Sequence, residues 1–365
     1  MAKLGEVCLL KAGKFVSAND ISPEYNKGLY PCFGGNGIRG YVADYTHDGE
    51  FPLIGRQGAL CGNVNLASGK FHATEHAVVV QPKTEMNVQW LYYALNAMNL
   101  GQYATGAAQP GLAVSKLETL SIEIPNISEQ NKIAQTLYKV EQLVNFRKQQ
   151  LAKLDELVKA RFVEMFGTFP ANPFRWSIGK IQDVVSDVRY GSSRPAVEGG
   201  KYPYLRMNNI TYSGELDLRD TKRIDIPDSE LDKCTVRRGD VLFNRTNSKE
   251  LVGKTCVYNR DELMVLAGFV IRVRINERIR PEVLSAFLNM DFSKRMLIGM
   301  CKTAIGQANI NAKELQNIDL YIPPIELQDQ FVTLKNKIDQ QKQTVQQSLG
   351  KLELLKKALM QEYFG

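Results

Sequence analysis

The feature that most constrains this chain is an internal repeat. Residues 124–167 align with residues 322–365 without a gap, at an offset of 198. Identical pairs include Ile-Pro at 124–125 and 322–323, Lys-Ala at 159–160 and 357–358, and Phe-Gly at 166–167 and 364–365. So many identities in one register indicate a duplication.

The repeat extends beyond these segments. At the same offset Leu117 falls on Leu315, whereas residues 4–7 resemble residues 178–181 at an offset of 174. The second copy is therefore expected to be about 24 residues longer, through loop insertions on a shared scaffold. We predict a first globular part at 1–123, a helix at 124–167, a second globular part at 168–321 and a second helix at 322–365.

Both repeated segments carry a heptad pattern of apolar residues, which predicts two helices of about forty residues. Each follows a proline and ends at a glycine, and Ser128 is a plausible N-cap. At about 1.5 Å per residue, each would be roughly 60 Å long. We expect the two helices to pair as an intramolecular antiparallel coiled coil; the alternative is that each lies on its own globular part. The predicted seam consists of Ile133, Leu137, Val140, Val144, Leu151, Leu154 and Val158 with Phe331, Leu334, Ile338, Val345, Leu352, Leu355 and Leu359.

The globular parts mix strand-like and helical runs separated by glycine-rich turns. Residues 77–80 and 269–273 are typical of strands, whereas residues 88–99 and 281–289 are typical of helices. We therefore predict the α+β class, with a curved antiparallel sheet in each globular part.

Composition excludes several other classes. No run approaches about 18 apolar residues, so a membrane span is not expected, and the start lacks a signal-peptide pattern, which predicts a cytoplasmic protein. Six cysteines without any Cys-x-x-Cys pair are interpreted as buried reduced thiols. The net charge of +7 is uneven: residues 1–123 carry −1 and residues 168–321 carry +5. Charge alone would not identify the first part as a nucleic-acid binder.

Polar side chains that could contact DNA are concentrated in four turns, at residues 33–40, 54–58, 205–209 and 242–248. Arginine can pair with guanine and asparagine or glutamine with adenine, while serine, threonine and lysine can contact phosphate. The alternative is that these residues only satisfy turn geometry.

Enzyme signatures are incomplete. Residues 33–37 match the F-x-G-x-G pattern of adenine methyltransferases, but residues 172–175 lack the second proline of the catalytic loop. The His-Ala-Thr-Glu-His run at 72–76 leads into a strand, where two imidazoles at i and i+4 would lie about 13 Å apart, so we interpret them as surface or turn histidines. A phosphate-binding G-x-x-x-x-G-K-[ST] loop is missing. We expect no catalytic site, no metal and no cofactor.

The order of parts, with Ile-Pro at the start and Phe-Gly at the end of each helix, resembles the specificity subunit of type I restriction-modification systems. The resemblance implies two target recognition domains, at 1–123 and 168–321, which read a bipartite double-stranded DNA site. It implies helices that space the two domains and dock two methyltransferase subunits, joined by restriction/translocase subunits, with no catalysis by this chain. The DNA contacts that we carry over are Arg39, Arg56, Gln109, Arg206, Asn208, Arg245, Asn247 and Gln307.

Two other functions fit the same sequence features. One is a DNA reader of a related fused or stand-alone modification system, which its co-purifying subunits would reveal. The other is a coiled-coil interaction protein without any role on DNA.

Overall fold

The computed structural model describes residues 1–106, 110–304 and 307–365, which form two compact units. Unit 1 comprises residues 1–148 and 347–365, and unit 2 comprises residues 149–346. Each unit therefore contains one globular part together with portions of both long helices. No helix in these ranges is long and apolar enough to cross a membrane.

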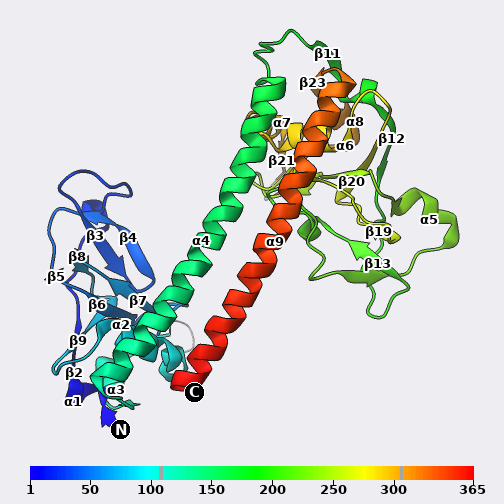
Figure 1. Ribbon diagram of the computed structural model, residues 1–365. Helices are drawn as coiled ribbons and strands as arrows, with labels where there is room; N and C mark the ends of the chain where they lie inside the picture. The colour runs from blue at the N-terminus through cyan, green and yellow to red at the C-terminus, as the bar shows by residue number, and fades with distance from the viewer. Residues whose placement is uncertain (107–109, 305–306) are drawn as a thin grey trace. The chain divides into compact units, whose positions relative to one another are not determined.

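The long helices are α4 (Ile127–Phe166) and α9 (Ile325–Phe364), and they pack in opposite directions (Figure 1). In unit 1, Lys356 Nζ lies 2.7 Å from Glu141, and Lys148 Nζ lies 3.4 Å from Glu353. In unit 2, the rings of Phe162 and Phe331 lie 5.6 Å apart. Residue numbers rise along one helix as they fall along the other, which confirms the predicted antiparallel coiled coil.

Two details of the predicted helices were wrong. The N-cap of α4 is Asn126 rather than Ser128, because Asn126 Oδ1 accepts a hydrogen bond from the Glu129 amide at 3.0 Å. Leu355 is 46% exposed and lies outside the seam. In that turn the half-buried Lys356 occupies the contact face with its ion pair to Glu141, so the preceding residue points about 100° away. At the other end of α4, Gly167 has the positive φ of 82° expected of a helix-terminating glycine.

The globular part of unit 1 contains two four-stranded sheets, in the orders β2-β9-β6-β7 and β4-β3-β8-β5. Helix α2 (Val88–Ala97) contacts β6 and β7. A strand pair, β1 (Ala2–Lys3) with β10 (Ser121–Ile122), and the short helices α1 (Leu4–Val7) and α3 (Val114–Glu118) complete this part. The sheet strands are β2 (Cys8–Ala12), β3 (Tyr30–Gly34), β4 (Gly37–Val42), β5 (His47–Asp48), β6 (Phe51–Gly55), β7 (Val64–Ala67), β8 (Lys70–Ala73) and β9 (Ala77–Pro82).

Unit 2 repeats this design, with sheets β12-β20-β16-β18 and β14-β13-β19-β15. The strand pairs β3–β8 and β13–β19, which occupy the same place in the two units, are parallel. The sequence predicted antiparallel pairing only. A third sheet, β17-β22-β21, occurs in unit 2. The strands are β11 (Ser177–Lys180), β12 (Val185–Tyr190), β13 (Tyr202–Leu205), β14 (Lys222–Ile224), β15 (Thr235–Val236), β16 (Val241–Asn244), β17 (Thr246–Asn247), β18 (Thr255–Val257), β19 (Met264–Leu266), β20 (Val270–Ile275), β21 (Lys302–Ala304), β22 (Gln307–Asn309) and β23 (Asp319–Ile322); the helices are α5 (Asp228–Cys234), α6 (Pro281–Asn289), α7 (Asp291–Met300) and α8 (Ala312–Gln316).

Backbone hydrogen bonds correct the register of the repeat near its start. The Leu4 amide donates to Leu120 O at 2.8 Å, and the Ile181 amide donates to Ile318 O at 2.9 Å. Leu4 therefore corresponds to Ile181, at an offset of 177 rather than 174. With the offset of 198 at the other end, the second copy is 21 residues longer rather than 24.

In each unit, one of the buried cores draws on the globular part and on both helices. In unit 1, Trp90 and Leu91 of α2 pack with Ile133 and Leu137 of α4, and Phe364 of α9 borders the same core. In unit 2 the helices contribute three buried phenylalanines, Phe162, Phe166 and Phe331. Burying a large apolar side chain contributes roughly 1.5–3 kcal/mol, so both helices are integral to both cores.

A buried glutamine fixes each long helix to its globular part. Gln130 is 2% exposed; its Oε1 accepts from the Asn87 amide at 2.9 Å and its Nε2 donates to Pro125 O at 2.8 Å. Gln328, 198 residues later, is fully buried and makes the same contacts with the Arg280 amide (2.8 Å) and Pro323 O (2.9 Å). Since Asn87 and Arg280 are the N-cap residues of α2 and α6, each glutamine joins two helix N-termini.

Replacing either glutamine with alanine is expected to destabilise the protein by about 1–3 kcal/mol, because a buried amide N–H and a carbonyl lose their partners. Urea denaturation of Gln130→Ala and Gln328→Ala measures the change. Gln135→Ala, at an exposed position of α4, is the matched control and should change the free energy of unfolding by less than about 0.5 kcal/mol. Equal stability of all three variants would contradict this role.

Candidate nucleic-acid interface

Two of the sequence-predicted DNA contacts, Arg56 and Arg245, occupy the same place in the two units. Each follows the last residue of equivalent strands, β6 and β16. The Arg56 amide donates to His76 O at 3.0 Å, and its carbonyl accepts from Leu112 at 2.9 Å. The Arg245 amide donates to Phe269 O at 3.0 Å, and its carbonyl accepts from Ile310 at 2.9 Å. The backbone therefore holds both arginines identically, although their sequence offset of 189 lies between the two offsets of the repeat.

The side chains of this arginine pair are partly buried. In both, Nε is buried and has no hydrogen-bond partner among the described residues. The Arg245 guanidinium stacks on Tyr190, with Cζ 4.8 Å from the ring centroid, a cation–π contact that orients the group. Both guanidiniums thus have hydrogen-bonding capacity that the described residues do not use.

The other predicted residues are less alike. Arg39 on β4 is exposed, and so is Asn208 in the 3₁₀ turn after β13. Arg206 is committed to an ion pair with Asp220, at 2.8 Å. Asn247 of β17 contacts Asn244 at 3.4 Å and accepts from the Ser248 amide at 2.9 Å, so part of its amide serves the turn.

The two predicted glutamines lie near the arginine pair along the chain. Gln109 falls outside the described residues. Gln307 begins β22, but nothing is described of its side chain. The residues that follow the two glutamines pair with the residues that follow the two arginines. In unit 2, Ala308 and Asn309 pair with β17, which directly follows Arg245. In unit 1, an isolated bridge joins Gly111 to Gln57.

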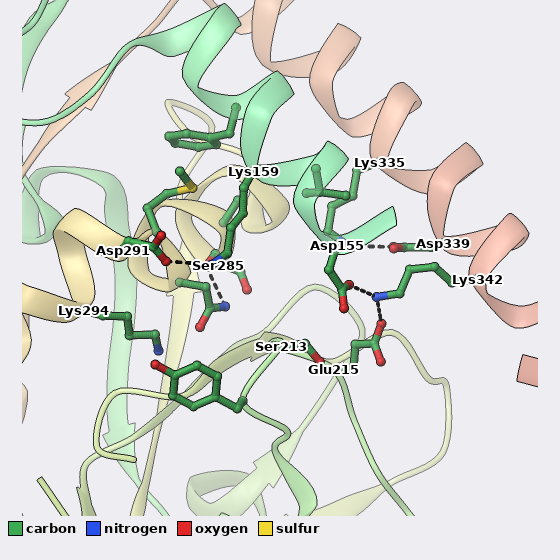
Figure 2. Close-up of a pocket in the computed structure, with 17 residues that line it drawn as sticks. Asp155, Lys159, Ser213, Glu215, Ser285, Asp291, Lys294, Lys335, Asp339 and Lys342 are labelled. Carbon is green, nitrogen blue, oxygen red and sulfur yellow. Dashed lines mark hydrogen bonds and ion pairs between the residues drawn. The ribbon is translucent and has the colours of Figure 1, made fainter. Parts of the chain in front are cut away.

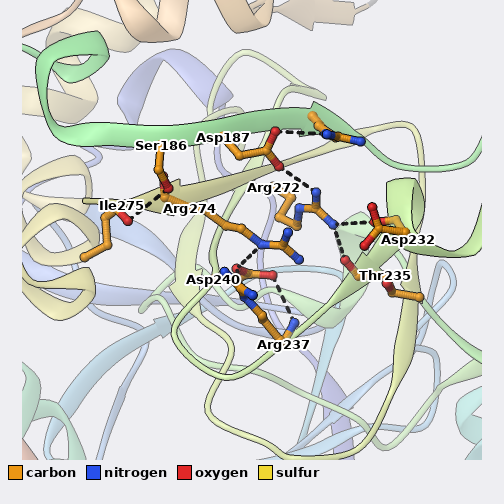
Figure 3. Close-up of polar contacts among 10 residues, drawn as sticks. Ser186, Asp187, Asp232, Thr235, Arg237, Asp240, Arg272, Arg274 and Ile275 are labelled. Atoms are coloured by element: carbon orange, nitrogen blue, oxygen red, sulfur yellow. Dashed lines mark hydrogen bonds and ion pairs between the residues drawn. The ribbon is translucent and has the colours of Figure 1, made fainter. Parts of the chain in front are cut away.

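Two arginines of the second globular part form internal ion pairs. Arg272 is 1% exposed and donates to Asp187 at 2.7 Å. It also donates to two backbone carbonyls, of Asp232 and Thr235 (Figure 3). Arg274 donates to the buried Asp240 at 3.0 Å. These two arginines are committed to ion pairs within the sheet and are not available to a ligand.

A pocket of about 240 Å³ in unit 2 is lined by several charged side chains (Figure 2). Lys342 pairs with both Asp155 and Glu215, and Lys159 lies 2.7 Å from Asp291. Lys294 donates to Gly253 O at 2.6 Å, and burial lowers the pKa of this lysine to about 8. Because Lys342 of α9 joins Glu215 of the loop at residues 212–215 to Asp155 of α4, and Lys159 joins α4 to α7, we assign the pocket a structural role.

The histidine motif does not form a metal site. His72 is buried in β8, with Nε2 3.2 Å from Lys14 O, so its interpretation as a surface or turn residue was wrong; His76 lies in the following turn beside Glu75. Within the described ranges, no group of three or more His, Cys, Asp and Glu side chains could hold a metal ion. All six cysteines are free, and five are buried; burial raises the pKa of the Cys61 thiol, which Arg56 partly opposes.

Comparison with known proteins finds similarity to type I specificity subunits. Residues 1–156 match the type I restriction modification DNA specificity domain. The specificity subunit of the type I restriction enzyme EcoprrI from Escherichia coli is 53% identical over 143 residues, which are 39% of this chain and 36% of that subunit. The first 156 residues of this chain are therefore similar to a type I specificity domain.

Other specificity subunits match more of the chain at lower identity. The EcoKI specificity subunit of Escherichia coli K12 is 22% identical over 249 residues, 64% of this chain and 53% of that subunit. The alignments therefore span little more than a third of the EcoprrI subunit and about half of the EcoKI subunit. The crystal structure of the M. genitalium type I S subunit has a similar fold, with a TM-score of 0.63 at 18% identity. The superposition covers 100% of this chain and 95% of that subunit. A chain from a structural study of complex assembly and conformational transition in a type I system has a TM-score of 0.56, also at 18% identity, with 100% of this chain and 96% of that chain covered.

Proposed function

We propose that this chain is a non-catalytic DNA-recognition subunit that reads a bipartite double-stranded site. One half-site would contact the globular part at 1–123 and the other that at 168–321, each acting as a target recognition domain. The observation that carries the proposal is the arginine pair: Arg56 and Arg245 are held by matching backbone hydrogen bonds, and the Nε of each has no hydrogen-bond partner among the described residues. A guanidinium fork suits either guanine in the major groove or a phosphate.

The family and the helices support a division of labour with partner subunits. Two methyltransferase subunits would supply base flipping and methyl transfer, and restriction/translocase subunits would complete the complex. The coiled-coil segments at 124–167 and 322–365 would dock the methyltransferase subunits and set the spacing of the two half-sites.

The decisive experiment mixes the purified chain with methyltransferase subunits and selects from a random duplex library. Enrichment of two short sequences at one fixed spacing is expected. Enrichment of a single continuous site would favour a reader of a related modification system. Enrichment of no sequence would support the coiled-coil interaction protein and refute the proposal.

A further inference from the structure

A hydrogen-bonded turn in each unit places an aromatic side chain beside the arginine of the candidate interface. In unit 2 the turn is residues 267–270, between β19 and β20, and in unit 1 it is residues 74–77, between β8 and β9. In each turn the amide of the fourth residue donates to the carbonyl of the first, at 2.9 Å in unit 2 and 3.0 Å in unit 1. Phe269 and His76 are the third residues of these turns and therefore occupy equivalent places.

Each aromatic residue lies opposite an arginine of the pair. The Arg245 amide donates to Phe269 O at 3.0 Å, which adds one more pair to the antiparallel β16–β20 ladder. Arg56 and His76 extend the β6–β9 ladder in the same way, also at 3.0 Å. Opposite residues of an antiparallel ladder project from the same face, with Cβ atoms about 4.5–5.5 Å apart. The aromatic ring and the guanidinium therefore project from the same face of the sheet in both units.

The side chain of Phe269 is exposed, although the backbone of its turn is fixed. The residue is 53% exposed. The Ala267 amide donates to Leu205 O at 2.8 Å, and the Gly268 amide donates to Ser192 O at 2.7 Å. A ring on an anchored backbone loses little conformational freedom when a ligand covers it, and covering it removes apolar surface from water. Single exposed apolar residues are common, but this position carries an aromatic ring in both copies of the repeat.

The two aromatic residues differ in the chemistry that they offer. His76 has ring nitrogens that can form hydrogen bonds, and its Nε2 lies 3.2 Å from Glu75. Phe269 offers only an apolar ring, and the apolar group that DNA presents in the major groove is the methyl group of thymine. Neighbouring base pairs are about 3.4 Å apart, which is close to the separation of opposite residues on the ladder. An arginine and the ring opposite it can therefore reach adjacent base pairs.

We propose that Phe269 is a specificity-determining residue that contacts the methyl group of a thymine beside the nucleotide that Arg245 contacts. The inference rests on the proposed function, because it requires that unit 2 reads DNA through Arg245. It adds that one position of this half-site is selected by an apolar contact rather than by hydrogen bonds.

The experiment uses the full chain with methyltransferase subunits and the duplex selected from the random library. Selection with Phe269→Ala locates the position: one thymine of one half-site should lose its preference, while the rest of the bipartite sequence is retained. Uracil at that position then removes the methyl group alone. The unchanged protein should bind the uracil duplex about fourfold more weakly, which corresponds to about 0.8 kcal/mol for one methyl group. Phe269→Ala should bind the thymine and uracil duplexes equally.

Two controls isolate the contribution of the ring. Leu263→Ala removes another apolar side chain, 45% exposed, that precedes β19 at the opposite end of this strand, and it should leave the selected sequence unchanged. Uracil in the other half-site should affect the unchanged protein and Phe269→Ala equally. A ring that only stabilised its turn would weaken binding of the thymine and uracil duplexes alike.

The outcomes separate this inference from the proposed function. If a bipartite site is selected but Phe269→Ala keeps every thymine, the inference is wrong. It is also wrong if the unchanged protein does not distinguish thymine from uracil at the position that Phe269→Ala relaxes, because the ring would then contact another part of the duplex. If the unchanged protein selects no bipartite site, the proposed function fails, and this inference fails with it.

Discussion

Arg245→Ala is expected to abolish preference at one position of one half-site and to leave the other half-site unchanged, whereas Arg56→Ala should do the reverse. A bidentate arginine–guanine contact contributes about 1–3 kcal/mol of discrimination, which corresponds to roughly fivefold to more than a hundredfold in relative affinity. Each variant is expected to affect only one half-site because the two arginines occupy equivalent places in different units. Selection from the duplex library with each variant measures the effect.

Two further variants make this test specific. Arg245→Lys keeps the charge but loses the planar fork, so it should lose base preference if the contact is to guanine and keep most affinity if the contact is to phosphate. Arg219→Ala removes the same charge from a side chain that is 88% exposed and should leave the selected sequence intact. If Arg56→Ala and Arg245→Ala weaken binding equally for every sequence, neither arginine reads a base.

Lengthening both long helices by one heptad is expected to lengthen the preferred spacer and to leave the half-site sequences unchanged. The insertions belong after Lys148 in α4 and after Gln346 in α9, where the two units meet in the sequence of both helices. Seven residues add about 10.5 Å of helix, which matches about three base pairs of duplex at roughly 3.4 Å each. The selected spacer length measures the change.

The matched control is the same heptad inserted into α4 alone. This insertion shifts one side of the antiparallel seam against the other, and it should destabilise the protein rather than give a longer spacer. Loss of both half-sites by the double insertion, in a chain that remains folded, would refute the idea that helix length sets the spacing.

The sequence predicted the long helices closely because a heptad pattern is a local signal that both copies share. Helices α2 and α6 were also predicted within two residues, for the same reason. Leu355 was misassigned because periodicity alone does not tell an apolar residue from the aliphatic stem of a paired lysine such as Lys356. Where a contact depends on the partner helix, the pattern of one helix is insufficient.

The candidate site was predicted only in part. Arg56 and Arg245 were each singled out from their turns, but their equivalence was hidden, because insertions between strands change the offset from 177 to 198. Backbone hydrogen bonds reveal it, and these are not local in sequence. Gln130 and Gln328 were missed, although the gapless alignment places them opposite each other; a glutamine that is buried in both copies was the available signal.

The way in which each core draws on both helices has a consequence for the order of folding during synthesis. Unit 2 is continuous in sequence, whereas unit 1 needs residues 347–365, which are translated after all of unit 2. Leu359, Met360 and Phe364 cover the unit 1 core, so that core stays open until the ribosome has made them. Domains usually fold in the order in which they emerge. In this chain the first globular part to be made is the last that can close.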